Sequence, residues 1–232
     1  MLSEQYQEIS SNLKNLKTHQ VIKKCINNLF LKRIAYVCSF GAESAVLLHM
    51  ISRIDKNLPI IFINTLKLFD ETLEYKKLLT NRFKLQNIIE ITPQKNDIEK
   101  EDLKGNLWSK NPNKCCNLRK VKILDKALHK FQAWFSGRKA YQSLQRSKNK
   151  IVETQDNKFI ISPLIWWTEK DIKDYYLKYE LPRHPLFHNG YLSIGCKHCT
   201  SKSYDVLDKR SGRWIGLDKT ECGIYKSNNN IK

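Results

Sequence analysis

Two pairs of cysteines in this chain of 232 residues could hold a metal centre, because four thiolates together bind zinc or an iron–sulfur cluster. Cys115 and Cys116 are adjacent in "KNPNKCCNLRK", and Cys196 and Cys199 form a C-x-x-C in "GCKHC". Zinc sites usually space the ligands of each pair by at least two residues, whereas adjacent ligands fit a polynuclear cluster more readily. The pattern favours a cluster over zinc, and either of these over buried structural cysteines.

A further cysteine, Cys222 in "DKTECGIY", could act as a nucleophile. Cys25 and Cys38 lie within apolar runs, as buried filler cysteines do, but Cys222 is flanked by polar residues and a glycine and has no cysteine nearby to pair with. A thiolate on an accessible segment can attack an electrophile. We expect Cys222 to be a nucleophile, and the alternative is a free surface thiol without a function.

Basic side chains occur close to these motifs. Arginine presents a fixed fork of donors that matches phosphate and sulfate oxygens, and its charge does not vary with pH. Taken singly, each of these cations is more often a solvated surface charge. The cations that we expect to face an anionic ligand are Lys120, Arg138, Arg146, Arg210 and Arg213.

The stretch "CSFGAES", residues 38–44, ends an apolar run with small residues at a predicted turn into a helix. In an open parallel sheet, ligands bind beyond the carboxyl ends of the strands, and backbone N–H groups at a helix N-terminus suit phosphate or sulfate. A tight turn without a ligand is an equally good interpretation of this stretch alone. The candidate binding residues in it are Ser39, Phe40 and Gly41.

The elements that must position these residues alternate between strands and helices. Residues 33–40 and 58–64 are short apolar runs typical of buried parallel strands, and residues 43–54 between them have the apolar density of a helix. This alternation predicts an α/β fold with a doubly wound, mostly parallel sheet. The further expected elements are a helical stretch at 3–30, helices at 68–83, 117–131 and 167–179, and strands at 87–93 and 132–137.

Length and composition limit the class of protein. We expect one domain over residues 1–232, with 1–32 as a helical lead-in and 203–232 as a mobile C-terminal tail that carries the nucleophile. The stretch "MLSEQYQEISSNLKNLK" does not show a basic leader followed by an apolar run, and no apolar run approaches the roughly 20 residues that cross a bilayer. We therefore expect a cytoplasmic protein without a membrane partner. The net charge of +18 comes largely from scattered lysines and decides nothing by itself.

Together these motifs resemble the assimilatory sulfonucleotide reductases, the family of adenylyl-sulfate and phosphoadenylyl-sulfate reductases. The resemblance implies an adenine-nucleotide α-hydrolase-like sheet, related to the PP-loop ATP pyrophosphatases. It also implies a 4Fe–4S cluster on Cys115, Cys116, Cys196 and Cys199, as in the branch that usually reduces adenosine 5′-phosphosulfate. The matching stretches cover most of the chain: SFGAESAVLLHM, LFDET, CCNLRKV, SGRKAYQSLQR, ISPLIWWTEKDI, LPRHPLFHNGYLSIGCKHCT, GRW and ECGIY.

The resemblance further implies a mechanism in sulfate assimilation. In that family, the cysteine matching Cys222 attacks the sulfur of the phosphosulfate, expels AMP and leaves a thiosulfonate, which thioredoxin or glutaredoxin resolves to sulfite. Lys120 matches the family lysine that lies between cluster and substrate. By the same analogy the cluster organises the site rather than transferring electrons, and a homo-oligomer is the usual assembly.

Three residues depart from the family pattern: Tyr225 replaces a tail histidine, Ser44 an aspartate of the first loop, and Asp70 a frequent proline. None of them removes a cluster ligand or the nucleophile. Two alternatives remain open. The first is the same reaction on 3′-phosphoadenosine 5′-phosphosulfate, whose additional phosphate the surplus of lysines could hold. The second is a zinc- or cluster-bearing protein of nucleic-acid thiolation, although the chain has no aromatic-interleaved module for binding nucleic acid.

Overall fold

A six-stranded sheet of order β3-β2-β1-β4-β6-β5 forms the centre of the protein in the computed structural model, which describes residues 2–205, 208–217 and 219–225. All neighbouring strands are parallel except β5, which runs antiparallel to β6 at the edge. The expected α/β fold with a mostly parallel sheet is confirmed. The strands are β1 Ile34–Cys38, β2 Ile60–Ile63, β3 Ile88–Ile91, β4 Ala133–Phe135, β5 Val152–Gln155 and β6 Lys158–Ile161.

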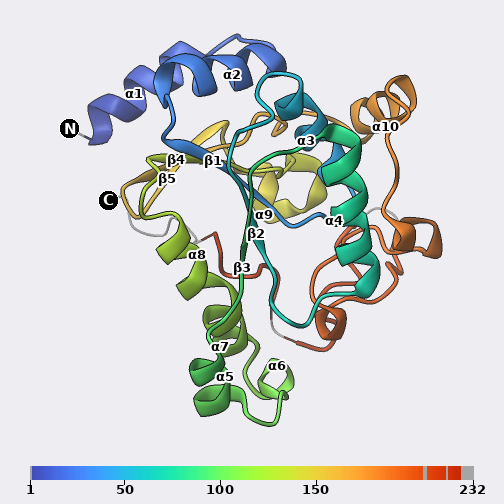
Figure 1. The fold of residues 1–232 in the computed structure, drawn as a ribbon. Helices are drawn as coiled ribbons and strands as arrows, with labels where there is room; N and C mark the ends of the chain where they lie inside the picture. Colours follow the sequence, from blue (N-terminus) through green and yellow to red (C-terminus); the bar gives the residue numbers. More distant parts are fainter. Residues whose placement is uncertain (1, 206–207, 218, 226–232) are drawn as a thin grey trace.

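Helices cover both faces of this sheet, and α5 to α8 form a column that extends away from it (Figure 1). The predicted helices and strands are present within a few residues of their expected ends, whereas β5 and β6 were not expected. None of the helices in the described ranges is long and apolar enough to span a membrane. The α-helices are α1 Leu2–Leu13, α2 Thr18–Lys24, α3 Ser44–Ser52, α4 Asp70–Phe83, α5 Lys95–Asp102, α6 Leu107–Lys110, α7 Pro112–Cys116, α8 Lys122–Ala127, α9 Leu144–Ser147 and α10 Glu169–Lys178.

Shorter helical turns join these elements. They are the π-helical η1 Cys25–Leu29 and η2 Asn117–Val121, and the 3-10 turns η3 Ala140–Gln142, η4 Pro185–Asn189 and η5 Lys197–Cys199. The helical lead-in expected before the first strand is therefore present as α1, α2 and η1. The turn η2 continues α7 directly into α8, so the predicted helix over 117–131 begins earlier and changes its hydrogen-bond spacing on the way.

Alternation of side chains along the strands builds a core on each face of the sheet. Tyr36 and Phe62 face the core that includes α1, α2, α3, α4 and α10. Ala35, Ile61 and Trp134 face the opposite core, to which α8 contributes. Because both faces are covered, the strands are apolar on both sides, which explains the nearly continuous apolar runs in the sequence.

The order of the strands reverses between β1 and β4, so a crevice is expected beyond the carboxyl ends of these two neighbours. The loop that follows β1 and the loop that follows β4 form its two sides. Phe40 in the first loop has a positive φ of 48°, and its backbone N–H donates to the Cys38 Sγ at 3.4 Å. This local geometry turns the chain sharply at the end of β1.

Candidate active site

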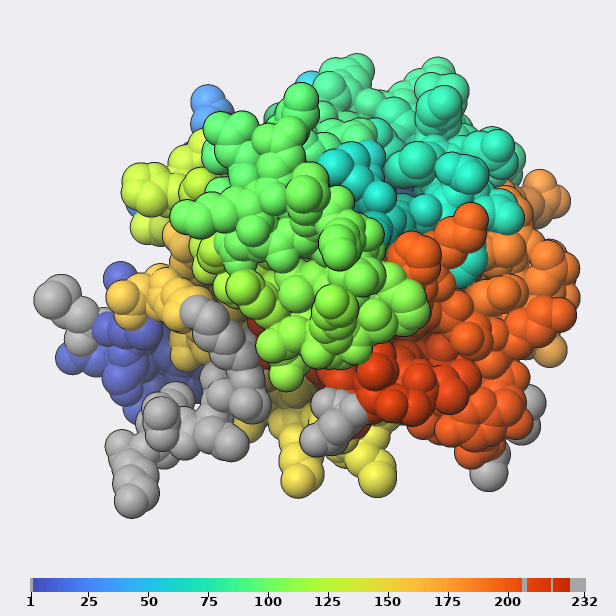
Figure 2. Space-filling model, turned by 90° about the horizontal axis from the view of Figure 1, so that it is seen from below, coloured from blue at the N-terminus to red at the C-terminus, as the bar shows by residue number. Residues whose placement is uncertain are grey.

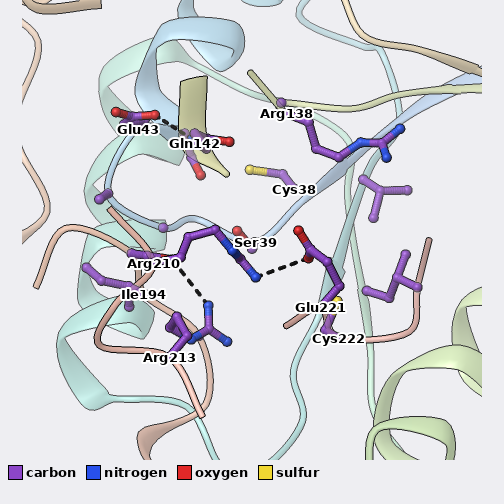
Figure 3. Close-up of a pocket in the computed structure, with 18 of the residues that line it drawn as sticks. Cys38, Ser39, Glu43, Arg138, Gln142, Ile194, Arg210, Arg213, Glu221 and Cys222 are labelled. Carbon is purple, nitrogen blue, oxygen red and sulfur yellow. Dashed lines mark hydrogen bonds and ion pairs between the residues drawn. The ribbon is translucent and has the colours of Figure 1, made fainter. Parts of the chain in front are cut away.

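A large cavity lies beyond β1 and β4, at the crevice that the strand order predicts. Figure 3 shows side chains from several segments, distant in sequence, pointing into it. Phe40 does not line it, because its ring is fully buried and packs edge-on against Phe62 at 5.3 Å between ring centroids. The predicted site residues that the cavity brings together are Ser39, Gly41, Lys120, Arg138, Arg146, Arg210, Arg213 and Cys222.

A second, smaller cavity is lined by the four paired cysteines, Cys115, Cys116, Cys196 and Cys199. Their segments are far apart in the sequence, but Figure 2 shows the column of α5 to α8 against residues 195–205 and 208–217 on one face of the molecule. All four thiols are free of disulfides. The tertiary structure therefore assembles the four donors that the two sequence motifs supply separately.

Local interactions explain how the two cysteine pairs come to face one cavity. The Asn111 side chain accepts a hydrogen bond from the Lys114 N–H at 2.9 Å and caps α7, which ends at the first cysteine pair. The C-x-x-C turn is tied to the segment after β2, because the Lys197 N–H donates to the Lys67 carbonyl at 2.8 Å. The Thr65 hydroxyl also lies 3.3 Å from the Cys196 Sγ.

The donor set of the small cavity fits an iron–sulfur cluster. Arg119, which is buried and lines this cavity, pairs with Asp102 at 2.6 Å, yet its buried Nε has no hydrogen-bond partner within the described ranges. A free donor at this place suits an anionic cluster with sulfur acceptors. Within the same ranges no three Cys, His, Asp or Glu side chains are arranged to hold a single metal ion. Four free thiols around one cavity are the ligand set that a 4Fe–4S cluster takes.

Lys120 lines both cavities and so lies between the cysteines and the larger cavity. Burial acts to lower the pKa of its ammonium, but the neighbouring Cys196, Cys222 and Cys116 outweigh it, and the pKa is raised. Lys120 therefore carries its positive charge at neutral pH. Its place within η2, a π-helical turn, is typical of functional sites, where an extra residue per turn redirects a side chain.

Two half-buried arginines hold the residue that precedes the candidate nucleophile. Arg146 donates to both carboxylate oxygens of Glu221, from Nε at 2.7 Å and from Nη2 at 3.1 Å. Arg210 donates from Nη2 to the same carboxylate at 3.1 Å, and Figure 3 shows Glu221 between Arg210 and Cys222. Burial acts to raise the pKa of Glu221, but Arg146 and Arg210 outweigh it, so the pKa is lowered and the carboxylate stays ionised.

The chain beyond Cys222 is anchored by an aromatic side chain. The Tyr225 hydroxyl lies 2.9 Å from the Ser136 Oγ, and the Tyr225 ring stacks on Trp134 with 5.2 Å between ring centroids. The Arg138 guanidinium lies 3.8 Å from the centre of the Tyr225 ring. Cys222 is therefore held between an ionic contact on one side and an aromatic contact on the other.

The cations of the large cavity fall into two groups by their partners. Arg138 pairs with Glu153 at 2.6 Å and Lys139 with Glu43 at 2.7 Å, so protein carboxylates balance their charges. For Lys120 and Arg213, no carboxylate of the described residues lies within ion-pair distance. Arg213 instead donates from Nε to the Cys199 carbonyl at 3.1 Å. Lys120 and Arg213 are thus the cations best prepared for an anionic ligand.

The sequence analysis did not identify Glu221, Glu153 or Ser136 as site residues. Glu221 had one usable signal, since it lies directly before the candidate nucleophile. For Glu153 and Ser136 the sequence offers no comparable signal. Both act through the distant residues that they contact, and those contacts exist only in the folded chain.

Residues 33–202 match the family model described as the phosphoadenosine phosphosulfate reductase domain. The chain is similar to an adenosine 5′-phosphosulfate reductase of Mesorhizobium japonicum, with 45% identity over 92% of this chain and 84% of the relative. It is also similar to an adenosine 5′-phosphosulfate reductase of Bacillus cereus strain Q1, with 42% identity over 84% of this chain and 85% of the relative.

Solved structures show the same fold. A phosphoadenylyl-sulfate reductase from Candida auris, in a phosphate complex, superposes with a TM-score of 0.71 at 23% identity, covering 84% of this chain and 96% of that one. An FMN adenylyltransferase from Candida glabrata superposes with a TM-score of 0.57 at 16% identity, covering 88% of this chain and 74% of that one. These two likenesses confirm the expected fold of the sheet.

Proposed function

The chain belongs to the phosphoadenosine phosphosulfate reductase family, and we propose that it reduces adenosine 5′-phosphosulfate to sulfite and AMP through a thiosulfonate on Cys222. As a member of this family it is an oxidoreductase that acts on a sulfur group. The observation that carries the proposed mechanism is the place of Cys222: it lines the same cavity as Lys120 and Arg213, beyond the carboxyl ends of β1 and β4.

The first step of the proposed mechanism forms a sulfur–sulfur bond. The Cys222 thiolate attacks the sulfate sulfur, the bond from that sulfur to the phosphate oxygen breaks, and AMP leaves with the electron pair. Lys120 and Arg213 face the region where the sulfate and the departing phosphate carry negative charge, and fixed cations there stabilise the transition state. The product on the enzyme is a cysteine thiosulfonate.

The second step needs a dithiol reductant, which we propose to be thioredoxin or glutaredoxin. A thiolate of that protein attacks the Cys222 Sγ, the sulfur–sulfur bond breaks and sulfite leaves. The second thiol of the reductant then releases Cys222 and forms the reductant's disulfide, so two electrons reach the sulfate sulfur in total. Cys222 is half-buried between Glu221 and Tyr225. The segment that carries it must therefore move away from the cavity before the reductant can reach the thiol.

Cys115, Cys116, Cys196 and Cys199 are the residues that we propose to hold a 4Fe–4S cluster. When bound, the cluster supplies a fixed negative charge next to Lys120 and organises the site, and no electron transfer through it is needed to balance the reaction. The chain's own residues carry the reacting atoms and the charges around them. Iron and sulfide analysis of protein purified without oxygen tests this assignment independently of activity.

The decisive experiment compares wild-type protein with Cys222→Ser. We expect wild-type protein, given thioredoxin, to release sulfite from adenosine 5′-phosphosulfate, and Cys222→Ser to release none while it keeps nucleotide affinity and iron content. Cys25→Ala is the matched control, because Cys25 is buried among the N-terminal helices, away from both cavities. Normal turnover by Cys222→Ser would refute the mechanism.

The same assay decides between the two nucleotides. The relatives described above are named for adenosine 5′-phosphosulfate, which supports the plain nucleotide as the substrate. We expect its kcat/KM to exceed that of the 3′-phosphorylated nucleotide when both are measured in parallel. A clear preference for the 3′-phosphorylated form would instead favour the alternative in which the surplus lysines bind the additional phosphate.

A further inference from the structure

Glu221 is the one acidic side chain that contacts both Arg146 and Arg210 among the described residues of the large cavity. All three nitrogens of Arg146 are engaged, Nε and Nη2 by the Glu221 carboxylate and Nη1 by the Gln142 side chain at 2.5 Å. Arg210 additionally donates to the Thr220 carbonyl at 2.8 Å. The two guanidinium groups thus hold a protein carboxylate where the cavity would hold an anionic ligand.

The guanidinium groups of Arg146 and Arg210 contact the same carboxylate, so these two positive charges lie close together and need an anion between them. Burial, together with the charge of Arg146, lowers the pKa of Arg210 to about 10, and Glu221 opposes this shift. Removing the carboxylate without replacing it would leave two half-buried cations facing each other, which is unfavourable. An anion of the right shape can therefore exchange with Glu221, whereas a neutral ligand cannot.

A phosphosulfate has the charge and the oxygen geometry for that exchange. Guanidinium forks bind carboxylate, sulfate and phosphate in the same bidentate manner. The Nε–Nη2 edge of Arg146 accommodates one such anion at a time, and Glu221 occupies it. Binding of the nucleotide at this edge and pairing of Glu221 with it are therefore mutually exclusive.

We propose that Glu221 is a built-in occupant of the anion site, which the phosphosulfate group displaces from Arg146 and Arg210 when it binds. This proposal rests on the proposed function. Because Glu221 is bonded to Cys222, the exchange releases the nucleophile's segment on the side that faces the substrate. Glu221 is thus a positioning residue, and it makes the mobility of Cys222 depend on occupancy of the anion site.

The contacts beyond Cys222 would persist during this exchange. Tyr225 is held by Ser136, Trp134 and the face of Arg138, and the Ile224 carbonyl accepts a hydrogen bond from Gln155 at 2.9 Å. None of these contacts involves Arg146 or Arg210. The segment would therefore lose its ionic anchor and keep its aromatic anchor, so that Cys222 moves without the whole tail leaving the cavity.

The test measures nucleotide binding in a background that cannot turn over. Binding of adenosine 5′-phosphosulfate to Cys222→Ser is compared by calorimetry with binding to the double variants Glu221→Gln/Cys222→Ser and Glu169→Gln/Cys222→Ser. We expect Glu221→Gln to tighten binding roughly three- to tenfold, because the internal competitor is weakened. Glu169→Gln changes the net charge equally, but Glu169 is exposed, and its ion pair among the described residues is with Lys209 rather than with Arg146 or Arg210. We expect no comparable tightening from it.

A second measurement follows the nucleophile directly in proteins that keep Cys222. Without nucleotide, Glu221→Gln should raise the rate of Cys222 alkylation by iodoacetamide several-fold over wild type and over Glu169→Gln, as followed by peptide mass spectrometry. Unchanged or weaker nucleotide binding by Glu221→Gln, with intact binding by Cys222→Ser, would overturn this inference alone. Absence of binding in every variant and in wild type would instead overturn the proposed function together with it.

Discussion

At the scale of single residues, His184 shows how a buried group makes stability depend on pH. His184 is fully buried, and its Nδ1 accepts a hydrogen bond from the Leu186 N–H at 3.2 Å. The proton of the neutral ring is therefore on Nε2, which donates to the Thr72 hydroxyl at 3.0 Å. Burial lowers the pKa of His184 from 6.5 to about 4. The imidazole is therefore held neutral, in one tautomer, by the fold.

The lowered pKa predicts a loss of stability in acid. Between pH 6.5 and pH 4 the unfolded chain binds a proton at His184 that the folded chain does not, so the free energy of unfolding falls as the pH falls through this range. At pH 5 we expect a loss of about 2 kcal/mol from this group relative to pH 7. Urea unfolding of wild type and His184→Asn at both pH values measures it, and an equal loss in both proteins would contradict the assignment.

Tyr225 matters at the same scale because it replaces the histidine that the family commonly has in its tail. Its ring between Trp134 and Arg138 gives it an anchoring role, for which the aromatic face is needed more than the hydroxyl. The sequence shows only that an imidazole is missing at this position. The structure shows that the tyrosine ring which replaces it contacts Trp134 and Arg138. Tyr225 thereby helps to keep Cys222 over the cavity.

This anchoring role predicts different outcomes for two substitutions of Tyr225. Tyr225→Phe keeps the ring and loses only the contact with Ser136, so turnover should stay within about threefold of wild type. Tyr225→Ala removes the ring and should lower kcat roughly tenfold, and it should also raise the alkylation rate of Cys222. Steady-state sulfite assays measure kcat for both variants. Equal activity of Tyr225→Ala and wild type would show that the aromatic anchor has no part in the reaction.

At the scale of elements, the β5–β6 hairpin gives the site contacts that the expected sheet lacked. Glu153 on β5 pairs with Arg138, and Gln155 at the end of β5 donates to the Ile224 carbonyl. The turn residues Asp156 and Asn157 have φ values of 49° and 59°, as a two-residue hairpin turn requires. The sequence "IVETQDNKFIIS" carries this signal, since Asp and Asn tolerate positive φ between two β-prone runs.

Helix η2 shows the opposite case, in which the sequence identified an element but not its geometry. The apolar residues of the stretch 117–131 have helical spacing. In the structure, the helical segment runs from Pro112 to Ala127. The π-helical turn at Asn117–Val121 cannot be recognised from the pattern of apolar residues. It adds only one residue to a single helical turn, and this hardly changes the spacing of apolar side chains. That turn helps to decide where the Lys120 side chain points.

At the scale of the whole molecule, the proposed cluster would join two parts of the chain that are distant in sequence and that also meet through the stacked rings of Trp108 and His198. Cys115 and Cys116 belong to the column of α5 to α8, whereas Cys196 directly precedes the 3-10 turn η5 and Cys199 ends it. A metal group bonded to both constrains the folded state and adds its binding free energy to stability. The homo-oligomer that the family resemblance implies stays a prediction.

Removal of the proposed cluster should therefore destabilise the protein as well as inactivate it. We expect protein stripped by an iron chelator to melt at a lower temperature and to release no sulfite, because the two cysteine segments lose the bonds that the cluster would make between them. Cys199→Ser should likewise lower the iron content and the melting temperature, whereas Cys25→Ala should leave the iron content unchanged. Calorimetry and iron analysis on the same samples test this, and equal melting temperatures with and without iron would argue against a structural role.

The sequence by itself determined the alternation of strands and helices, the two cysteine pairs and the separate cysteine near the C-terminus. These features are local, because periodicity and motif spacing depend only on neighbouring residues. It did not determine which candidate residues would meet. Phe40 was expected at the ligand, but a left-handed turn directs its ring into the core against Phe62.

Only the tertiary structure decided how the cations of the site are used. Arg146 and Glu221 are 75 residues apart in the sequence, and their contact exists because helix α9 and the segment around Cys222 meet over one crevice. The same packing leaves Lys120 and Arg213 without a carboxylate partner among the described residues. An ion pair depends on distance and burial in the folded chain, and neither quantity is encoded in the spacing of residues along the sequence.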